Sequence, residues 1–173
     1  MNNFSIRYLI SFLLLIPAQG VIFNHLVLFN VAVPLVFIYL IIMLPVTLGT
    51  NLSVLLGFLS GLAVDLFSDT PGVNALACTV LAFARKPLFH LYMSFDDDLA
   101  GRSPSSRTMG VGAYAKFVFT MALAYCLMVF TIEAFQFVNL QLTVLRVVAS
   151  TLYTFVLIFA IDCITLRRRE KKL

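Results

Sequence analysis

Long apolar runs, separated by short polar stretches and by proline and glycine, make up most of the chain. A helix needs about 20 mainly apolar residues to cross the hydrocarbon core of a bilayer. Runs close to that length recur from one end of the sequence to the other. The pattern predicts an all-α integral membrane protein with six transmembrane helices in one polytopic domain over 1–173. The predicted spans are 7–23, 31–46, 52–67, 73–91, 111–135 and 142–166.

Prolines modify two of these spans. Pro34 stands near the start of the second span and Pro45 near its end, where proline is tolerated. Pro87 falls inside the fourth span, and the residue before a proline disfavours helix, so we expect a break or kink there. Arg85 and Lys86 precede this proline, and we expect their charged ends to extend to the lipid headgroups.

The stretch 57–76 carries the most distinctive pattern, GFLSGLAVDLFSDTPGVNAL. Gly57, Gly61 and Asp65 recur at every fourth residue, which places them on one face of a helix. Two glycines at this spacing let another helix approach closely, while a carboxylate in a membrane is expected to face protein or water. A turn containing Gly72 follows. We interpret Gly57, Gly61, Asp65 and Gly72 as a helix-packing face or a partner face.

Composition supports a membrane protein and excludes several other classes. Of the 173 residues, 61% are hydrophobic and 12% are charged, whereas soluble domains are about half apolar and a quarter charged. The net charge of +4 comes from basic residues at the edges of the spans, so we expect no nucleic-acid partner. Cys78, Cys126 and Cys163 lie in apolar runs without disulfide or metal spacing, and we expect no cofactor.

The basic residues predict the orientation. An even number of spans puts both termini on one side, and basic residues favour the cytoplasmic side. We therefore predict cytoplasmic termini, with a cytoplasmic loop over 94–110 and a basic cytoplasmic tail over 167–173. Arg146 is then the only basic residue outside. The residues placed inside or at that interface are Arg7, Arg85, Lys86, Pro87, Arg102, Arg107 and Lys116.

Two acids are predicted to lie near Arg146 on the outer side. Asp65 comes late in the third span, Glu133 late in the fifth, and Arg146 early in the sixth. Charges inside membranes are usually paired, so we predict an outer charge network in which Arg146 pairs with at least one of these acids. The alternative is that each charge reaches interfacial water alone.

Two further stretches have a second interpretation. Residues 18–20 weakly resemble a signal-peptide cleavage site, although we interpret the first apolar run as a span. The acids Asp96, Asp97 and Asp98 are adjacent and would suit a divalent cation, but such charge runs are usually solvated.

The order and spacing of these features resemble the family of the rod shape-determining protein MreD, in a variant like those of the Bacteroidetes. The resemblance extends over nearly the whole chain. It departs from the family where Lys86 separates Arg85 from Pro87. The residues that carry it are the glycine and aspartate helix with its turn, Ala75-Leu76, Asn24-His25, Leu28-Phe29, Pro34, Arg85, Pro87, Glu133-Ala134-Phe135, Arg146 and the basic tail.

The resemblance implies a non-enzymatic membrane subunit of the bacterial cell-elongation complex. Members of this family bind the bitopic protein MreC. The surrounding machinery includes MreB, RodA and a class B penicillin-binding protein, and a homo-oligomer is possible. The resemblance also implies a fold like that of the substrate-binding subunits of energy-coupling-factor transporters.

Two other functions fit parts of the sequence. Gly61, Asp65 and Asp69 match the end of the CDP-alcohol phosphotransferase signature, but no acid precedes Asp65 to complete a metal site. A vitamin-binding transporter subunit would have the same length and spans. Asp65, Asn74, Glu133 and Arg146 would be its polar groups, so this alternative stays open.

Overall fold

The structure is a computed structural model that describes 3–23, 32–68, 70, 72–93, 103–134 and 140–170. For 3–7, 134, 140 and 165–170 it describes the backbone alone. The described residues form helices of three types and no strand. In chain order, these are α1 (Asn3–Ala18), the π-helix η1 (Gln19–Phe23), the 3-10 helix η2 (Val36–Ile38), α2 (Tyr39–Ile42), α3 (Thr50–Ser68), α4 (Val73–Tyr92), α5 (Ser106–Met109), α6 (Val111–Ala134) and α7 (Leu140–Glu170).

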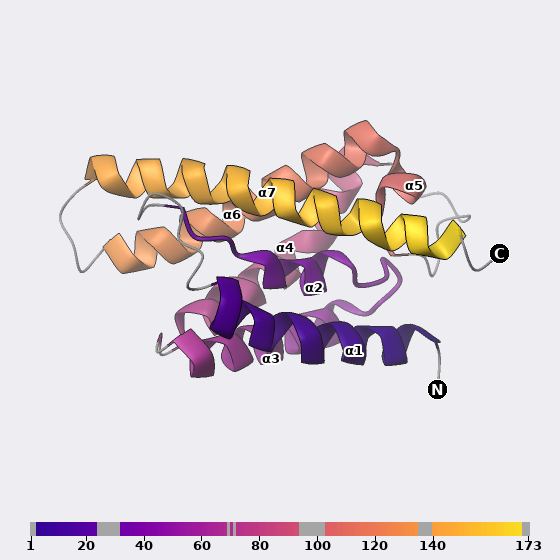
Figure 1. Cartoon of the computed structure of the whole chain (residues 1–173), viewed down its shortest axis with the longest axis horizontal. Coiled ribbons are helices and arrows are strands. Elements are labelled where there is room, and N and C mark those ends of the chain that lie inside the picture. Colours follow the sequence, from indigo (N-terminus) through magenta and orange to yellow (C-terminus); the bar gives the residue numbers. More distant parts are fainter. Residues whose placement is uncertain are drawn as a thin grey trace.

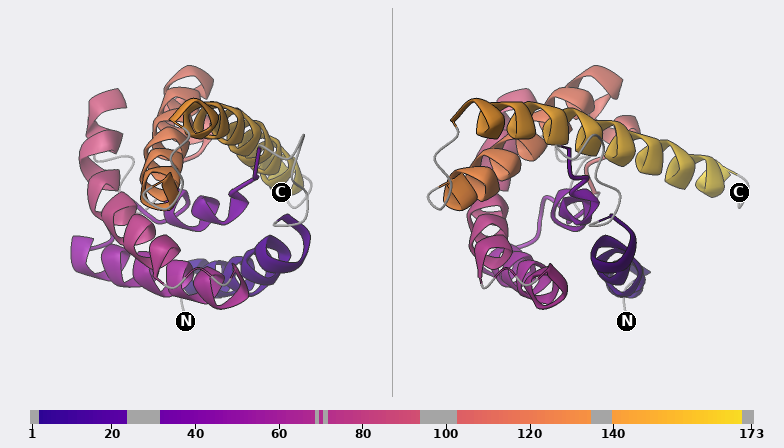
Figure 2. Two further views of the ribbon diagram at one scale, coloured as in Figure 1. Left: turned by 90° about the vertical axis from the view of Figure 1, so that its left-hand side faces the viewer. Right: turned by 60° about the vertical axis from the view of Figure 1, so that its left-hand side comes forward.

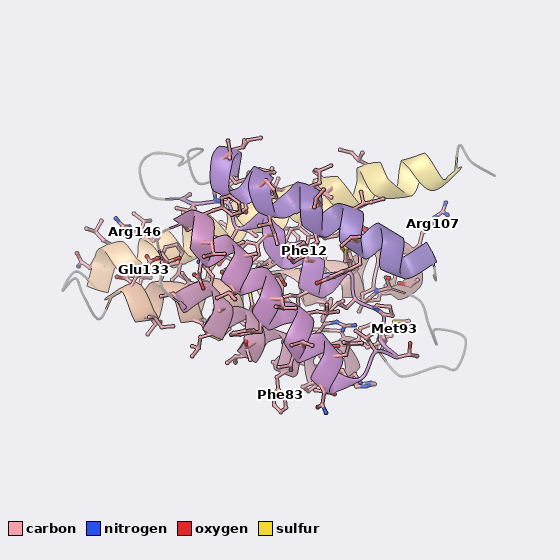
Figure 3. All side chains as sticks on the ribbon, turned by 90° about the horizontal axis from the view of Figure 1, so that it is seen from below. Phe12, Phe83, Met93, Arg107, Glu133 and Arg146 are labelled. Atoms are coloured by element: carbon pink, nitrogen blue, oxygen red, sulfur yellow. The ribbon has the colours of Figure 1, made fainter. Side chains whose placement is uncertain are left out.

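The long helices run back and forth between two ends of the molecule (Figure 1). Helix α1 begins and α7 ends at the same end, which we call the terminal end. Arg107 and Met93 also lie at the terminal end, whereas Glu133 and Arg146 lie at the opposite end, which we call the Arg146 end (Figure 3).

Three helices are long and apolar enough to cross a membrane: α3, residues Val111–Glu133 of α6, and residues Gln141–Ile164 of α7. A shorter apolar helix covers Tyr8–Phe23. Large apolar side chains point outward from these helices and from α4, as Phe83 does in Figure 3. An outer surface of this kind matches lipid rather than water. The chain is therefore an all-helical membrane protein.

The second predicted span is not a continuous helix. Of the described residues in this range, 32–46, only Val36–Ile42 is helical, and residues 33–35 have no helical conformation. At 1.5–2.0 Å per residue this helical part is roughly 10 Å long, far short of the bilayer core of about 30 Å. The physical reason is that the residue before a proline disfavours helical conformation, and this applies to Val33 before Pro34 and to Leu44 before Pro45.

Residues 32–46, which we call the central segment, form the core of the molecule. Every side chain from Val36 to Leu44 is buried. Figure 2 shows α2 in the middle of the molecule, with the long helices around it. The side chains from Val36 to Leu44 are mainly aliphatic and aromatic, so this segment supplies the apolar interior against which the longer helices pack.

The predicted break at Pro87 is absent, because α4 continues through it to Tyr92. Contacts after the proline hold the helix against α6. Phe89 packs edge-on against Phe117, with ring centroids 6.0 Å apart, and the Tyr92 hydroxyl lies 2.7 Å from Thr120 Oγ1. This packing offsets the backbone hydrogen bond that Pro87 cannot make.

Candidate functional site

Side chains from distant helices bind the backbone of the central segment. Gln19 donates from Nε2 to the Pro34 carbonyl over 2.8 Å, and its Oε1 accepts from the Val36 amide over 3.0 Å. On α7, Ser150 Oγ accepts from the Val33 amide over 3.0 Å and Thr154 Oγ1 accepts from the Leu35 amide over 2.9 Å. These bonds replace those that a helix would make, and they allow irregular backbone inside a membrane protein.

Arg85 binds the other end of the central segment. Its side chain is only 1% exposed, and Nη2 donates to the carbonyls of Leu44 over 2.5 Å and Pro45 over 2.9 Å. The other two nitrogens, Nε and Nη1, are buried and have no acceptor among the residues that the structure describes. The structure corrects the expectation that Arg85 reaches the headgroups: it points into the protein, whereas Lys86 is half-buried and Pro87 is exposed.

The glycine face of α3 lies against α4. A Cβ added to Gly57 would be 2.8 Å from Ala82 Cβ, and one added to Gly61 would be 2.6 Å from Ala75 Cα. Both distances are shorter than packed atoms allow, so each position needs glycine. The close approach that the spacing indicated is therefore made within the chain, by α4.

Asp65 lies where α3 turns into α4, and its carboxylate binds the start of α4. Oδ1 accepts from the Asn74 amide over 3.0 Å, and Oδ2 accepts from the Ala75 amide over 2.8 Å. Oδ1 also accepts from Thr70 Oγ1 over 2.8 Å and from Asn74 Nδ2 over 2.9 Å. Tyr125 on α6 donates its hydroxyl to Asn74 Oδ1. We call Asp65, Thr70, Asn74 and Tyr125 the Asp65 cluster.

Local backbone chemistry explains this geometry. The first amides of a helix have no partner within the helix and carry partial positive charge, so a carboxylate beside them is stabilised. Gly72 precedes α4 with φ of 82°, a left-handed conformation that glycine adopts without strain. Asp65 thus satisfies the start of the next helix after a turn that contains Gly72. Asp69 and Pro71 lie outside the described residues.

The predicted outer charge network is divided in the structure. Glu133 and Arg146 lie near one another at the Arg146 end, and their charges interact (Figure 3). Arg146 is exposed and Glu133 is half-buried. The hydrogen bonds of Asp65, in contrast, go to the Asp65 cluster and to Ala75. Of the two acids, Glu133 is the one beside Arg146.

Polar contacts also join elements near the terminal end. Asp162 on α7 is buried, and its Oδ2 accepts from the Ser106 amide over 3.2 Å and from Ser106 Oγ over 2.8 Å. It holds the short α5 against α7. The loop acids Asp96, Asp97 and Asp98 lie outside the described residues.

Sequence reasoning missed several of these side chains, namely Gln19, Ser150, Thr154, Tyr125 and Asp162. A signal for two of them was present, because Ser150 and Thr154 are four residues apart in an apolar helix and so share a face. Polar residues repeated at this spacing indicate a buried polar neighbour. No comparable spacing marks Gln19, whose partners Pro34 and Val36 lie 15 and 17 residues later in the chain.

The arrangement is suited to packing and to binding rather than to bond cleavage. The oxygens of Asp65 already accept four hydrogen bonds, which leaves them poorly placed to ligate a metal. Within the described residues, no group of three or more histidine, cysteine or acidic side chains would hold a metal ion. Comparison with protein families, curated proteins and solved structures finds no match to this chain.

Proposed function

We propose that this chain is a non-enzymatic, MreD-like membrane subunit of the bacterial cell-elongation complex that binds MreC. The observation that carries the proposal is that the residues of the resemblance act together as packing elements. Gly57 and Gly61 fit against α4, Asp65 and Asn74 bind each other at the turn, and Arg85 holds the central segment. Such roles suit a rigid subunit that positions partner proteins.

The orientation proposed for this subunit has cytoplasmic termini in the inner membrane. In support, α1 begins and α7 ends at one end of the molecule, where Arg107 also lies (Figures 1 and 3). Cysteine labelling in intact cells tests it. Cysteines placed at Ser103 and Thr70 should react from the cytoplasm and from outside, respectively. Labelling of the Thr70 position from the cytoplasm would overturn the orientation.

A lipid-facing surface beside the glycine face is the proposed site for the single span of MreC. The glycine face itself is occupied by α4, but Leu55, Leu59, Leu62 and Leu66 of α3 are exposed. A photo-crosslinking residue at Leu62 should capture MreC. The matched control is Leu152, an exposed leucine on α7. Equal capture at both positions would contradict a site on α3.

Purification from native membranes tests the function itself. The proposal predicts MreC as the principal partner, with MreB, RodA and a class B penicillin-binding protein in weaker association. A folded and abundant protein that carries none of these chains would overturn it.

A second candidate is the substrate-binding subunit of an energy-coupling-factor transporter. The observation in its favour is the central segment, because irregular backbone at membrane depth often lines substrate sites in transporters. The same purification separates the two functions. Transporter ATPases in place of MreC, together with a bound vitamin, would favour this candidate.

A further inference from the structure

Arg85 carries a charge that has no counter-ion among the described residues. Its acceptors are the carbonyls of Leu44 and Pro45, which are neutral. The described acids are engaged elsewhere: Asp65 with the start of α4, Glu133 with Arg146, and Asp162 with Ser106. A buried cation is therefore left to two neutral oxygens.

This arrangement is costly unless something else binds the guanidinium. An arginine side chain stays charged at neutral pH and carries five N–H donors, two of them on Nη2. Nη2 binds both carbonyls, while Nε and Nη1 are buried with no acceptor. Buried donors without partners, on a charged group above all, are strongly unfavourable. The missing partner has to be an acceptor, and a negative one would also neutralise the charge.

We propose that Arg85 is the anchor of an anion-binding site, for a phosphate or carboxylate group, beneath the turn formed by residues 45–49. This inference is independent of the function proposed above. The planar guanidinium suits oxyanions because its N–H groups point in fixed directions at several oxygens. The two carbonyls hold Nη2 in place, so the free nitrogens are oriented before the anion arrives.

The residues around the Arg85 guanidinium limit how large an anion can bind and by which route it can enter. Nε and Nη1 are shielded from solvent, so an anion can reach them only if the surrounding chain moves. Leu44 and Pro45, whose carbonyls bind Nη2, are buried, as is Val46, but Thr47 and Gly49 are exposed in the turn that follows. Apart from its two chain neighbours, no described residue has an atom within 4 Å of where a Cβ on Gly49 would be. Opening therefore requires this short turn to lift, which admits a small anion or the phosphate of a lipid headgroup.

Thermal unfolding of the full-length protein in detergent tests the site. Inorganic phosphate and acetate are added separately at constant ionic strength, against chloride. At 100 times Kd, the bound anion should raise the melting temperature by roughly 5 °C or more. Phosphatidylglycerol in mixed micelles is the third addition, and a rise with this lipid alone would identify the headgroup phosphate as the source.

Variants show whether Arg85 is responsible. Arg85→Met keeps a long side chain without the charge, and it should lose the temperature rise. Lys86→Met removes the neighbouring charge from the same turn and should keep it. If Arg85→Met fails to fold, phosphorus NMR of the wild-type and Lys86→Met proteins gives a second measurement, because phosphate exchanging with the site should show broadened lines in both.

Three results would overturn the proposal. The first is no temperature rise with phosphate, acetate or the lipid, which would mean that water alone occupies the free donors. The second is an equal rise in Arg85→Met and the wild type. The third concerns the loop acids: anion binding that appears only after Asp96, Asp97 and Asp98 are changed to asparagine would show that these acids already neutralise Arg85.

Discussion

Asp65 and Arg85 are both buried charges that bind backbone, but their bonding differs. The carboxylate of Asp65 accepts hydrogen bonds from two amides and two side chains, three of them at Oδ1 and one at Oδ2, so both of its oxygens have partners. The guanidinium of Arg85 uses one nitrogen and leaves two without acceptors in the described part of the chain. The first charge is satisfied by the fold, and the second is satisfied only in part. Asp65 therefore has a structural role, whereas Arg85 has donors that a ligand could still bind.

The loss of stability on removing either side chain depends on which buried groups are left without a hydrogen-bond partner. Loss of Asp65 exposes several donors at the start of a helix to an apolar interior. Loss of the Arg85 side chain removes a poorly paired charge. The carbonyls of Leu44 and Pro45 then each lose the hydrogen bond that they accept from Nη2. Poorly paired buried charges are often replaceable by apolar side chains, whereas well-bonded ones are not.

Asp65→Ala should destabilise the protein most. The change leaves the amides of Asn74 and Ala75 and the Thr70 hydroxyl without their acceptor. At about 1–3 kcal/mol for each unsatisfied buried group, partly relieved by relaxation, we expect a loss of about 3–5 kcal/mol. The measurement is the free energy of unfolding in a detergent titration. Asp65→Asn, which keeps one acceptor oxygen, should lose less, and equal losses for both would contradict the role of the second oxygen.

Gly61→Ile should have the second largest effect. The new side chain would collide with the backbone of Asn74 and Ala75, and relief requires α3 and α4 to separate. Overpacking of this kind costs about 1–3 kcal/mol. Melting temperature and the amount in the membrane should both fall. Gly112→Ala on α6 is the control, because no described atom outside the adjoining backbone of α6 lies within 4 Å of where its Cβ would be. An abundant, folded Gly61→Ile protein that no longer captures MreC would show that this face binds the partner.

Arg85→Met should change stability by less than about 1 kcal/mol in the absence of added anion. The lost carbonyl bonds are offset by removal of a buried charge. The free energy of unfolding, measured beside that of Asp65→Ala, gives the comparison directly. A loss as large as that of Asp65→Ala would mean that Arg85 is fully bonded in solution.

Arg146→Ala should have the smallest effect, about 0.5 kcal/mol. Its partner Glu133 is half-buried, but Arg146 is exposed, and exposed ion pairs contribute little. The check is the melting temperature, with the exposed Lys116→Ala on α6 as control. A drop in melting temperature as large as that of Gly61→Ile would show that the interaction of Arg146 with the half-buried Glu133 contributes strongly to stability.

The long helices could be predicted from the sequence because apolar length and polar breaks report them directly. Residues 52–67 and 111–135 differ from α3 and α6 by only a few residues at each end. The glycine spacing likewise predicted a close helix contact, since small residues four apart leave a flat face. It could not tell which helix fills that face, because the identity of a neighbour depends on the whole fold.

The central segment could not be predicted for a related reason. Its composition is as apolar as that of a spanning helix, so hydropathy alone does not separate a buried irregular segment from a span. What decides the outcome is whether distant side chains replace the helical hydrogen bonds. The buried position of Arg85 could not be predicted either. A basic residue near the end of a span is typical of the lipid interface, and it is the packing of α4 that places the Arg85 side chain inside the protein.

The bonds between α7 and the central segment also set the order of events during synthesis. Val33 and Leu35 are separated from Ser150 and Thr154 by 117 and 119 residues. At about 5–20 residues per second, a ribosome needs roughly 6–24 s to make that interval. During this time the amides of Val33 and Leu35 lack their native partners on α7. The central segment therefore adopts another conformation or binds a chaperone until α7 is made. Slow translation before α7 should therefore increase degradation of the nascent chain.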